Sequence, residues 1–288
     1  MRNPMNIHQI SKISLTPEVV DGIVFWTKNP LPMLARLSEI KDYMYYFQFT
    51  ITPYGKDVEP HVPIKSSKVL TSFKRLSDMI GADRIVWRYD PILINERYSL
   101  DYHIRAFRKI AEELHEYTRK VTISFIDEDY RGVKNNIKKL ALHDFPATSQ
   151  TQISASLAEI AQSYGLKIDT CAEKVELRHF GIEHARCIDD RIFSQLLGCH
   201  LNVKKDKTQR LECGCVESID VGMYNTCPNC CRYCYANYSQ NIVAKNFANH
   251  NPLSPLISGE LRSDDKITLR EVKSCKERQL NFESLKTI

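Results

Sequence analysis

Segments rich in β-branched and aromatic residues alternate along most of the chain with segments of helical periodicity, and this alternation constrains the fold most. The sequence predicts six strands, over 21–27, 45–52, 84–89, 121–126, 166–170 and 216–224. Helices are predicted over 31–41, 66–80, 100–118, 154–164 and 190–198, where apolar residues recur at three- and four-residue spacing. Such alternation favours a mostly parallel sheet, either open or closed into a barrel.

The size and composition are those of a globular protein. With 288 residues the chain can bury a full core, and its 43% hydrophobic and 26% charged residues are ordinary values. We predict a single β/α-barrel-like domain over 1–288, with a distinct segment at about 205–240 and a C-terminal tail at 241–288. No stretch approaches the roughly 18 apolar residues that a membrane helix needs, and the N-terminus lacks a signal-peptide core. We therefore expect a cytoplasmic protein with no membrane partner.

The charge pattern supports a nucleic-acid partner only weakly. The net charge is +5, and the basic residues are scattered apart from Lys204, Lys205, Lys207 and the nearby Arg210. Short basic runs of this kind are usually solvated loops. Nucleic-acid binding therefore stays an open alternative.

Polar residues follow several of the predicted strands. In parallel α/β folds the chemistry gathers at the carboxyl ends of the strands, where loops vary without unfolding the core. Lys28 follows the first predicted strand, Arg88 and Asp90 end the third, and Glu173 follows the fifth. Each of them alone is more often an ordinary loop residue, but together they are our candidates for holding a substrate.

The ten cysteines are confined to the second half of the chain, since none precedes Cys171 and six fall between Cys213 and Cys234. In a reducing compartment this distribution favours metal binding over a disulfide framework. Residues 227–235 read Cys-Pro-Asn-Cys-Cys-Arg-Tyr-Cys-Tyr and contain two overlapping spacings. One is Cys227-x3-Cys231-x2-Cys234, and the other pairs Cys227 with Cys230 and Cys231 with Cys234.

The two spacings predict different metals. A four-thiolate zinc site usually takes its two Cys-x2-Cys pairs from separated turns, whereas here Cys230 and Cys231 are neighbours whose side chains diverge. Three thiolates on one loop suit a [4Fe–4S] cluster, whose fourth iron is then open to a substrate. We therefore predict an iron–sulfur cluster at Cys227, Cys231 and Cys234.

The spacing Cys227-x3-Cys231-x-Tyr233-Cys234 resembles the signature loop of the radical S-adenosylmethionine superfamily, including the aromatic residue before the last cysteine. It also follows the predicted strand 216–224. Over nearly the whole chain the sequence resembles the domain of unknown function 1848 family. The resembling stretches are 24–30, 47–50, 52–55, 88–91 and 213–220.

The superfamily resemblance implies a mechanism. Each of the three cysteines would ligate one iron, and the amino and carboxylate groups of S-adenosylmethionine would chelate the fourth. An electron, supplied by a donor such as a flavodoxin or ferredoxin, would release methionine and a 5′-deoxyadenosyl radical that abstracts hydrogen from an unknown substrate. Tyr233 would pack near the adenine or would anchor the loop. The alternative is an iron–sulfur or zinc protein without adenosyl chemistry, acting in electron transfer or nucleic-acid binding.

Four further cysteines, Cys171, Cys187, Cys213 and Cys215, could form a second, fully protein-ligated iron–sulfur or zinc site, or could be buried apolar residues. The family resemblance also implies an additional N-terminal strand and helix before the segment matching 2–6, so that one strand of the barrel is expected to be missing. The overall prediction is an α/β protein with a TIM-like, partial β/α barrel and a C-terminal cysteine-rich iron–sulfur segment.

Overall fold

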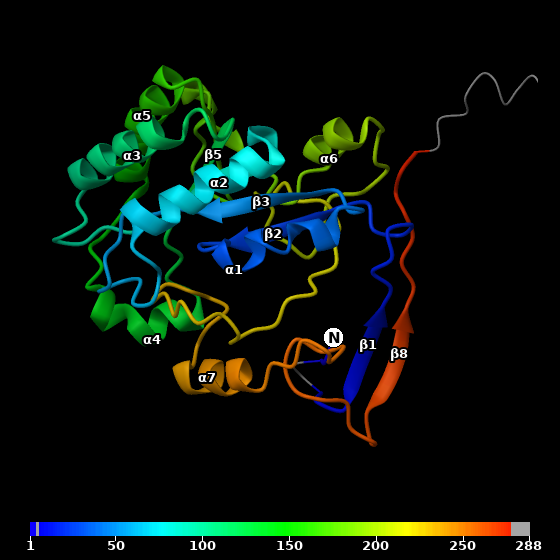
Figure 1. Cartoon of the computed structure of the whole chain (residues 1–288). Coiled ribbons are helices and arrows are strands. Elements are labelled where there is room, and N and C mark those ends of the chain that lie inside the picture. The colour runs from blue at the N-terminus through cyan, green and yellow to red at the C-terminus, as the bar shows by residue number, and fades with distance from the viewer. Residues whose placement is uncertain (4–5, 278–288) are drawn as a thin grey trace, which may run out of the picture.

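The computed structural model describes residues 1–3 and 6–277 (Figure 1). The strands are β1 Gln9–Ile13, β2 Ile23–Thr27, β3 Tyr45–Thr50, β4 Ile85–Ile92, β5 Lys120–Phe125, β6 Lys167–Thr170, β7 Glu183–His184 and β8 Lys266–Arg270. The α-helices are α1 Leu31–Leu34, α2 Leu70–Ile80, α3 Leu100–Leu114, α4 Arg131–Leu140, α5 Ala147–Ser163, α6 Asp190–Leu197 and α7 Gln240–Ala248. Short 3₁₀ helices lie at Leu37–Ile40, Ala82–Arg84 and Arg178–Phe180, and a π-helical turn at Lys65–Val69 precedes α2.

The main sheet contains six parallel strands in the order β2-β3-β4-β5-β6-β7. Because neighbours in the sheet are also neighbours in sequence, right-handed crossovers place successive connections on the same face. Helices α2, α3 and α5 cover that face (Figure 1). Within the described residues the sheet stays open, with β2 and β7 at its edges. The predicted α/β class with a parallel sheet is therefore confirmed, and the residues that the structure describes form no closed barrel.

The two faces of the sheet differ in chemistry. Toward the helices the strands bury large apolar side chains, such as Trp87 of β4, which stacks on Phe107 of α3 with 4.8 Å between ring centroids. The opposite face is polar, and the strand register aligns the following side chains across β3 to β6: Thr50, Arg88, Thr122 and Asp169. Buried polar groups need hydrogen-bonding partners. Some of these partners come from the cysteine-containing loops described below.

The predicted strand at 216–224 is wrong. Val216 forms only an isolated antiparallel bridge with Lys205, and its backbone N–H donates to the carbonyl of Ile188 instead of to a sheet partner. Further along, the Asp220 carboxylate accepts a hydrogen bond from the Gly222 backbone N–H, which turns the chain. Local side-chain bonding of this kind competes with strand pairing. The cysteine loop at 227–234 therefore follows an irregular segment.

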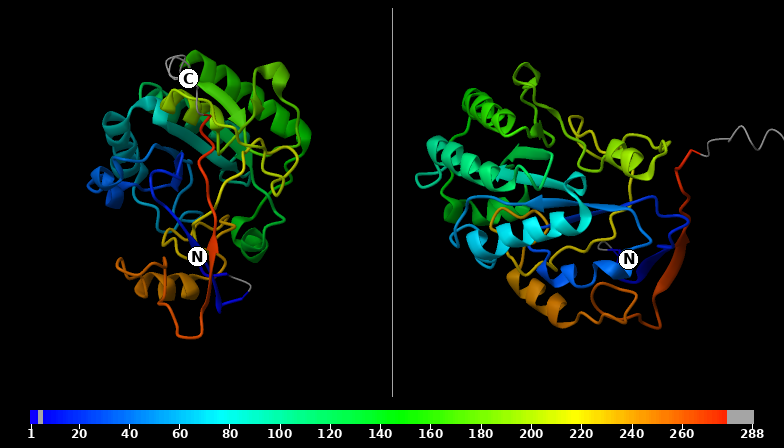
Figure 2. Two further views of the ribbon diagram at one scale, coloured as in Figure 1. Left: turned by 90° about the vertical axis from the view of Figure 1, so that its right-hand side faces the viewer. Right: turned by 45° about the horizontal axis from the view of Figure 1, so that its top comes forward.

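Several elements were not predicted from the sequence: β1, β7, β8, α4 and α7. Strands β1 and β8 pair in parallel and form a two-stranded ribbon beside the main sheet (Figures 1 and 2). The tail expected at 241–288 thus contains α7 and β8, and its last residues, 278–288, lie outside the described residues. None of the helices described here is long and apolar enough to span a membrane.

Candidate metal centre

The loop containing Cys227, Cys231 and Cys234 lies at the carboxyl edge of the parallel sheet. The Arg232 N–H donates to the Val58 carbonyl at 2.9 Å, and the His61 N–H donates to the Asn229 carbonyl at 3.3 Å. Val58 and His61 belong to the connection that follows β3, and the loop also contacts α4, which follows β5. In Figure 1 the segment that contains this loop, coloured yellow to orange, passes beneath the sheet toward α4. Parallel α/β folds place their sites at this edge.

The three thiols have different surroundings. Cys231 is buried, Cys234 is half-buried and Cys227 is exposed. Burial raises the pKa of Cys231 to about 12, while Lys28 acts in the opposite direction. Burial also raises the pKa of Cys234, against the lowering effect of the nearby backbone N–H groups of Ala236 and Asn237. Donors and a cation directed at sulfur favour thiolates, which are the form that binds metal.

A buried carboxylate ties the cysteine loop to the sheet. Glu59 is 1% exposed, and its Oε1 accepts hydrogen bonds from Lys28 Nζ at 2.9 Å, from Thr52 Oγ1 at 2.6 Å and from the Tyr233 hydroxyl. Lys65 Nζ forms an ion pair with Oε2 at 2.5 Å. Burial alone would raise the pKa of Glu59, but Lys28 and Lys65 outweigh it and hold the pKa at about 2. Tyr233 thus anchors the loop, and its contact with adenine stays a prediction.

Helix α4 contacts the same loop through a glycine. A Cβ atom added at Gly132 would lie 2.3 Å from the carbonyl oxygen of Cys234, a separation that real Cβ atoms do not adopt. One turn later, Asn136 Nδ2 donates to the Arg232 carbonyl at 3.1 Å. The absence of a side chain at position 132 therefore allows the loop backbone to approach the helix.

We expect Gly132→Ala to lower the free energy of unfolding by about 1–3 kcal/mol, because the added methyl group overpacks this contact. In an unobstructed helix the same change would stabilise the protein by roughly 0.5–1 kcal/mol. The sign of the change in unfolding free energy therefore shows whether the contact is close. Urea unfolding measures the difference. Asn135→Ala, on the exposed side of α4, is the control and should stay within about 0.5 kcal/mol of wild type. A stabilised Gly132→Ala protein would contradict the close contact.

The second group of cysteines also comes together. Cys187, Cys213 and Cys215 form a small buried cluster with Cys171 packed against it. The sulfurs of Cys171 and Cys187 are 3.2 Å apart, and Cys215 Sγ accepts hydrogen bonds from the backbone N–H groups of Cys187 and Ile188. Cys171 directly follows β6, Cys187 lies between β7 and α6, and the other two lie in the irregular segment after α6. Four cysteines from three separate segments of the chain thus converge beside the polar face of the sheet.

The substrate candidates all make intramolecular contacts. Arg88 is 4% exposed, and it donates to Cys187 Sγ at 2.9 Å and to Asp90 Oδ2 at 2.9 Å. Glu173 Oε1 accepts the Phe125 N–H at 2.7 Å, and burial raises the pKa of Glu173 to about 7. Lys28 is paired with the buried carboxylate described above. Whether these residues hold a substrate stays a prediction.

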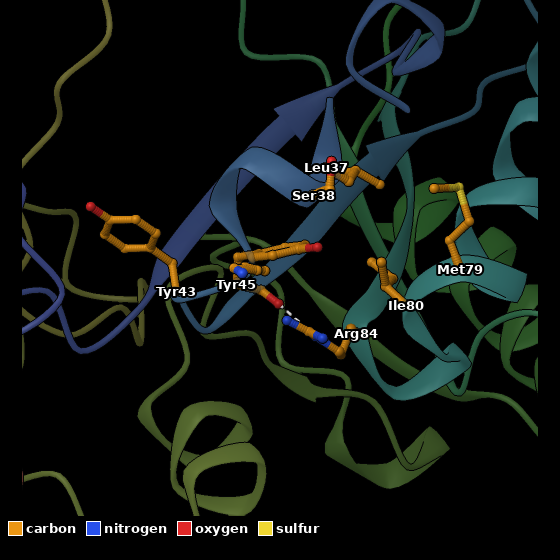
Figure 3. Close-up of a pocket in the computed structure, with 8 residues that line it drawn as sticks. Leu37, Ser38, Tyr43, Tyr45, Met79, Ile80 and Arg84 are labelled. Carbon is orange, nitrogen blue, oxygen red and sulfur yellow. Dashed lines mark hydrogen bonds between the residues drawn. The ribbon is translucent and has the colours of Figure 1, made fainter. Parts of the chain in front are cut away.

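A pocket of about 340 Å³ lies at the other end of the strands (Figure 3). Tyr45, which begins β3, and Arg84, which precedes β4, line it, and Arg84 Nε donates to the Tyr45 carbonyl at 2.9 Å. This is the amino edge of the sheet, opposite to the cysteine loop. The pocket therefore belongs to a part of the fold where parallel α/β proteins seldom place their chemistry.

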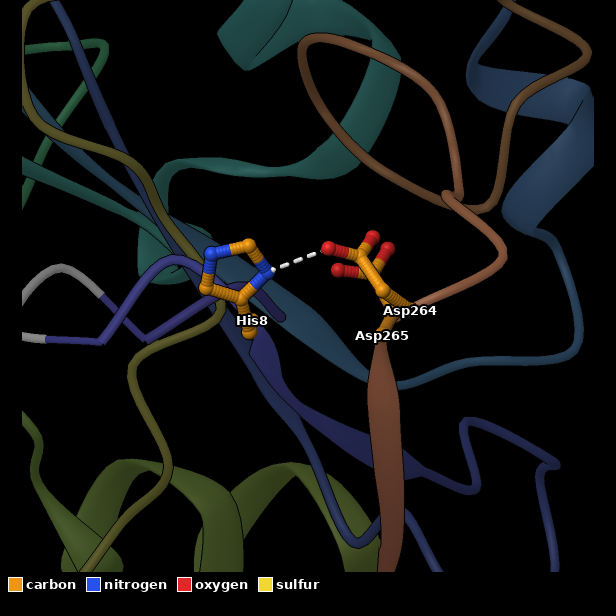
Figure 4. Close-up of side chains that lie close together, drawn as sticks. All are labelled: His8, Asp264 and Asp265. Atoms are coloured by element: carbon orange, nitrogen blue, oxygen red, sulfur yellow. Dashed lines mark ion pairs between the residues drawn. The ribbon is translucent and has the colours of Figure 1, made fainter.

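Three side chains meet on the two-stranded ribbon (Figure 4). Within residues 1–3 and 6–277, only His8, Asp264 and Asp265 bring three ligand atoms of His, Cys, Asp or Glu within 4.8 Å of one another. His8 Nδ1 lies 2.9 Å from Asp264 Oδ2, and Arg2 pairs with Asp265 at 2.5 Å. Because Arg2 already compensates one carboxylate, this group is explained by ion pairing.

The model of the family described as Domain of unknown function (DUF1848) matches residues 1–236. The match includes the whole six-stranded sheet and both groups of candidate cysteines, while α7 and β8 lie beyond it. Comparison with curated proteins gives no match. Because the family model covers well over half of the 288 residues, the chain belongs to the DUF1848 family.

Proposed function

We propose that the protein binds a [4Fe–4S] cluster through Cys227, Cys231 and Cys234 and cleaves S-adenosylmethionine reductively. The observation that carries this proposal is the position of the three-cysteine loop at the carboxyl edge of a parallel sheet. The strand order, with successive strands adjacent, is also that of an opened β/α barrel, and we propose a partial barrel of this kind as the scaffold.

The donor set fits a cluster with one iron free of protein ligands. Burial raises the pKa of both Cys231 and Cys234, and Lys28 opposes this effect at both thiols, so its positive charge suits a negatively charged thiolate cluster. Cys227 is exposed, so a small molecule can reach this side of the loop. When bound, the cluster supplies the electron that breaks the carbon–sulfur bond and yields a 5′-deoxyadenosyl radical.

The residues of the chain position the site and keep water from one side of it. Cys231 and Tyr233 pack against the main core, and Glu59 fixes Tyr233 through its hydroxyl. Lys28 Nζ lies 5.4 Å from the centre of the Tyr233 ring and retains donors for an anionic group. We propose that the substrate lies along the polar face of the sheet, near Arg88 and Asp90, and that a flavodoxin or ferredoxin supplies the electron.

Electron paramagnetic resonance of the reduced, anaerobically reconstituted protein tests the proposal. Adding S-adenosylmethionine should change the spectrum of the cluster, because its amino and carboxylate groups coordinate the open iron. Methionine methyl ester, whose carboxylate is blocked, is the control and should leave the spectrum unchanged. If the spectrum of a fully loaded cluster does not change when S-adenosylmethionine is added, the alternative is favoured: an iron–sulfur protein that transfers electrons without adenosyl chemistry.

A further inference from the structure

Among the four cysteines Cys171, Cys187, Cys213 and Cys215, the sulfurs of Cys171 and Cys187 are closer together than the ligands of a cubane cluster. The Cys171 and Cys187 sulfurs are 3.2 Å apart, the Cys187 backbone N–H donates to Cys215 Sγ at 3.2 Å, and Cys213 belongs to the same buried cluster. A tetrahedral ion with zinc–sulfur bonds of about 2.3 Å separates its ligand sulfurs by about 3.8 Å. A [4Fe–4S] cubane binds each thiolate to a different iron and holds them much farther apart. The Cys171–Cys187 contact therefore suits a single ion, which would draw the other two sulfurs closer, because no three of the four sulfurs lie within 4.8 Å of one another in the described residues.

Hydrogen-bond donors converge on these sulfurs. The backbone N–H groups of Cys187 and Ile188 donate to Cys215 Sγ at 3.2 and 3.4 Å. The buried guanidinium of Arg88 donates to Cys187 Sγ at 2.9 Å. A neutral thiol is a weak acceptor, so three donors on two sulfurs indicate an environment built for thiolates. Buried thiolates in turn need a cation, and four of them exceed what Arg88 can compensate.

The protein holds the ligands rigidly from several elements. The Cys187 carbonyl accepts hydrogen bonds from Tyr46 at 2.7 Å and from Gln48 at 2.8 Å, both on β3. The Gly214 N–H, between two of the cysteines, donates to the Ala185 carbonyl at 3.1 Å. Such supporting bonds fix the orientation of metal ligands and are typical of structural sites.

We propose that Cys171, Cys187, Cys213 and Cys215 bind a single zinc ion as four thiolates, with Arg88 as the buried cation that supports Cys187. The ion joins the end of β6 and the loop before α6 to the irregular segment after α6. That segment continues into the loop of Cys227, Cys231 and Cys234, so the ion holds in place the chain that leads into the proposed cluster site. The inference does not rest on adenosyl chemistry, because the two groups share no ligand.

The test uses the full chain carrying Cys227→Ala, Cys231→Ala and Cys234→Ala, purified without oxygen, so that only the second group remains. Plasma mass spectrometry should find one zinc and no iron per chain, with no acid-labile sulfide. Exchange with cobalt(II) should give the ligand-field absorption of a tetrahedral tetrathiolate. Adding Cys187→Ser should abolish this absorption, whereas Cys199→Ser, at a cysteine outside both groups, should preserve it. Arg88→Met should weaken zinc binding by about 10- to 100-fold in competition with a chelator.

Iron with labile sulfide in the triple variant, a metal-free folded protein, or a Cys171–Cys187 disulfide in place of metal would each overturn the proposal. If the triple variant does not fold, zinc is measured in the wild-type protein, where one zinc beside the iron is expected and its absence contradicts the inference. Iron content of the Cys187→Ser protein reports separately on the first group. Failure at one group can therefore be distinguished from failure at the other.

Discussion

Replacing Cys231 by Ala is expected to abolish cluster binding, whereas replacing its neighbour Cys230 is expected to preserve it. Cys231 is buried beside Lys28 and Glu59, and its thiol is coupled electrostatically to those of Cys227 and Cys234. Cys230 is only half-buried, and its sulfur reaches no closer than 3.9 Å to the Cys227 carbonyl oxygen. The two side chains therefore point into different environments.

The iron content of the Cys231→Ala protein after anaerobic reconstitution should fall from about four atoms per chain to nearly none, with a parallel loss of sulfide. Cys230→Ala is a matched control because it removes one thiol from the same turn, at a residue with φ of 51° that Ala can occupy at similar strain. Equal iron loss in both variants would support the other spacing, in which Cys227 and Cys230 are both metal ligands, and would contradict the three-cysteine site. Iron and zinc are quantified together in both proteins.

Replacing Glu59 by Gln should lower the free energy of unfolding at pH 7 by about 3–5 kcal/mol, because it removes one partner of a buried charge group. The Glu59 side chain is 1% exposed, and its partners Lys28 and Lys65 are 13% and 22% exposed. Glutamine retains hydrogen bonding to Thr52 and Tyr233 but leaves two lysines without a counter-charge. Urea unfolding followed by circular dichroism measures the loss.

This stabilisation should depend on pH in a defined direction. The pKa of Glu59 is about 2 in the folded protein, below its ordinary value of 4.5. Its stabilising effect is therefore fully present above pH 4.5 and is lost as the pH falls toward 2. The difference between wild type and Glu59→Gln should shrink over that range. Glu39→Gln, at an exposed pair with Arg36, is the control and should cost less than about 1 kcal/mol. If Glu59→Gln lowered the free energy of unfolding by less than about 1 kcal/mol, as an exposed pair would, the buried charge group would be contradicted.

The elements that the sequence predicted share a strong local pattern. Strand β3 reads Tyr-Tyr-Phe-Gln-Phe-Thr, and α3 repeats apolar residues at helical spacing, so each pattern indicates its own element. Strand β8 exposes all five residues, and no buried face marks it in the sequence. The segment 216–224 has a strand-like composition, but its backbone is bonded to Ile188 and Lys204. Those partners are distant in sequence and could not be predicted.

The candidate site was predictable only where its residues are close in sequence. The spacing of Cys227, Cys231 and Cys234 indicated a metal loop, and the grouping of four other cysteines is matched by their contacts in the fold. Glu59 and Lys65 were missed because the contact between Glu59 and Tyr233 spans 174 residues. A lone glutamate in a loop carries no signal of such a contact. The contact between Arg88 and Cys187 likewise forms only because the folded sheet brings two distant segments together, so no local sequence pattern indicates it.

Formation of 5′-deoxyadenosine tests the central claim most directly. The protein is reconstituted without oxygen, reduced with dithionite and incubated with S-adenosylmethionine, and the products are separated by liquid chromatography. Wild type and Cys230→Ala should form 5′-deoxyadenosine and methionine in equal amounts, slowly in the absence of substrate, and Cys231→Ala should form neither. A wild-type protein that holds a complete, reduced cluster and S-adenosylmethionine but yields no 5′-deoxyadenosine would contradict the account.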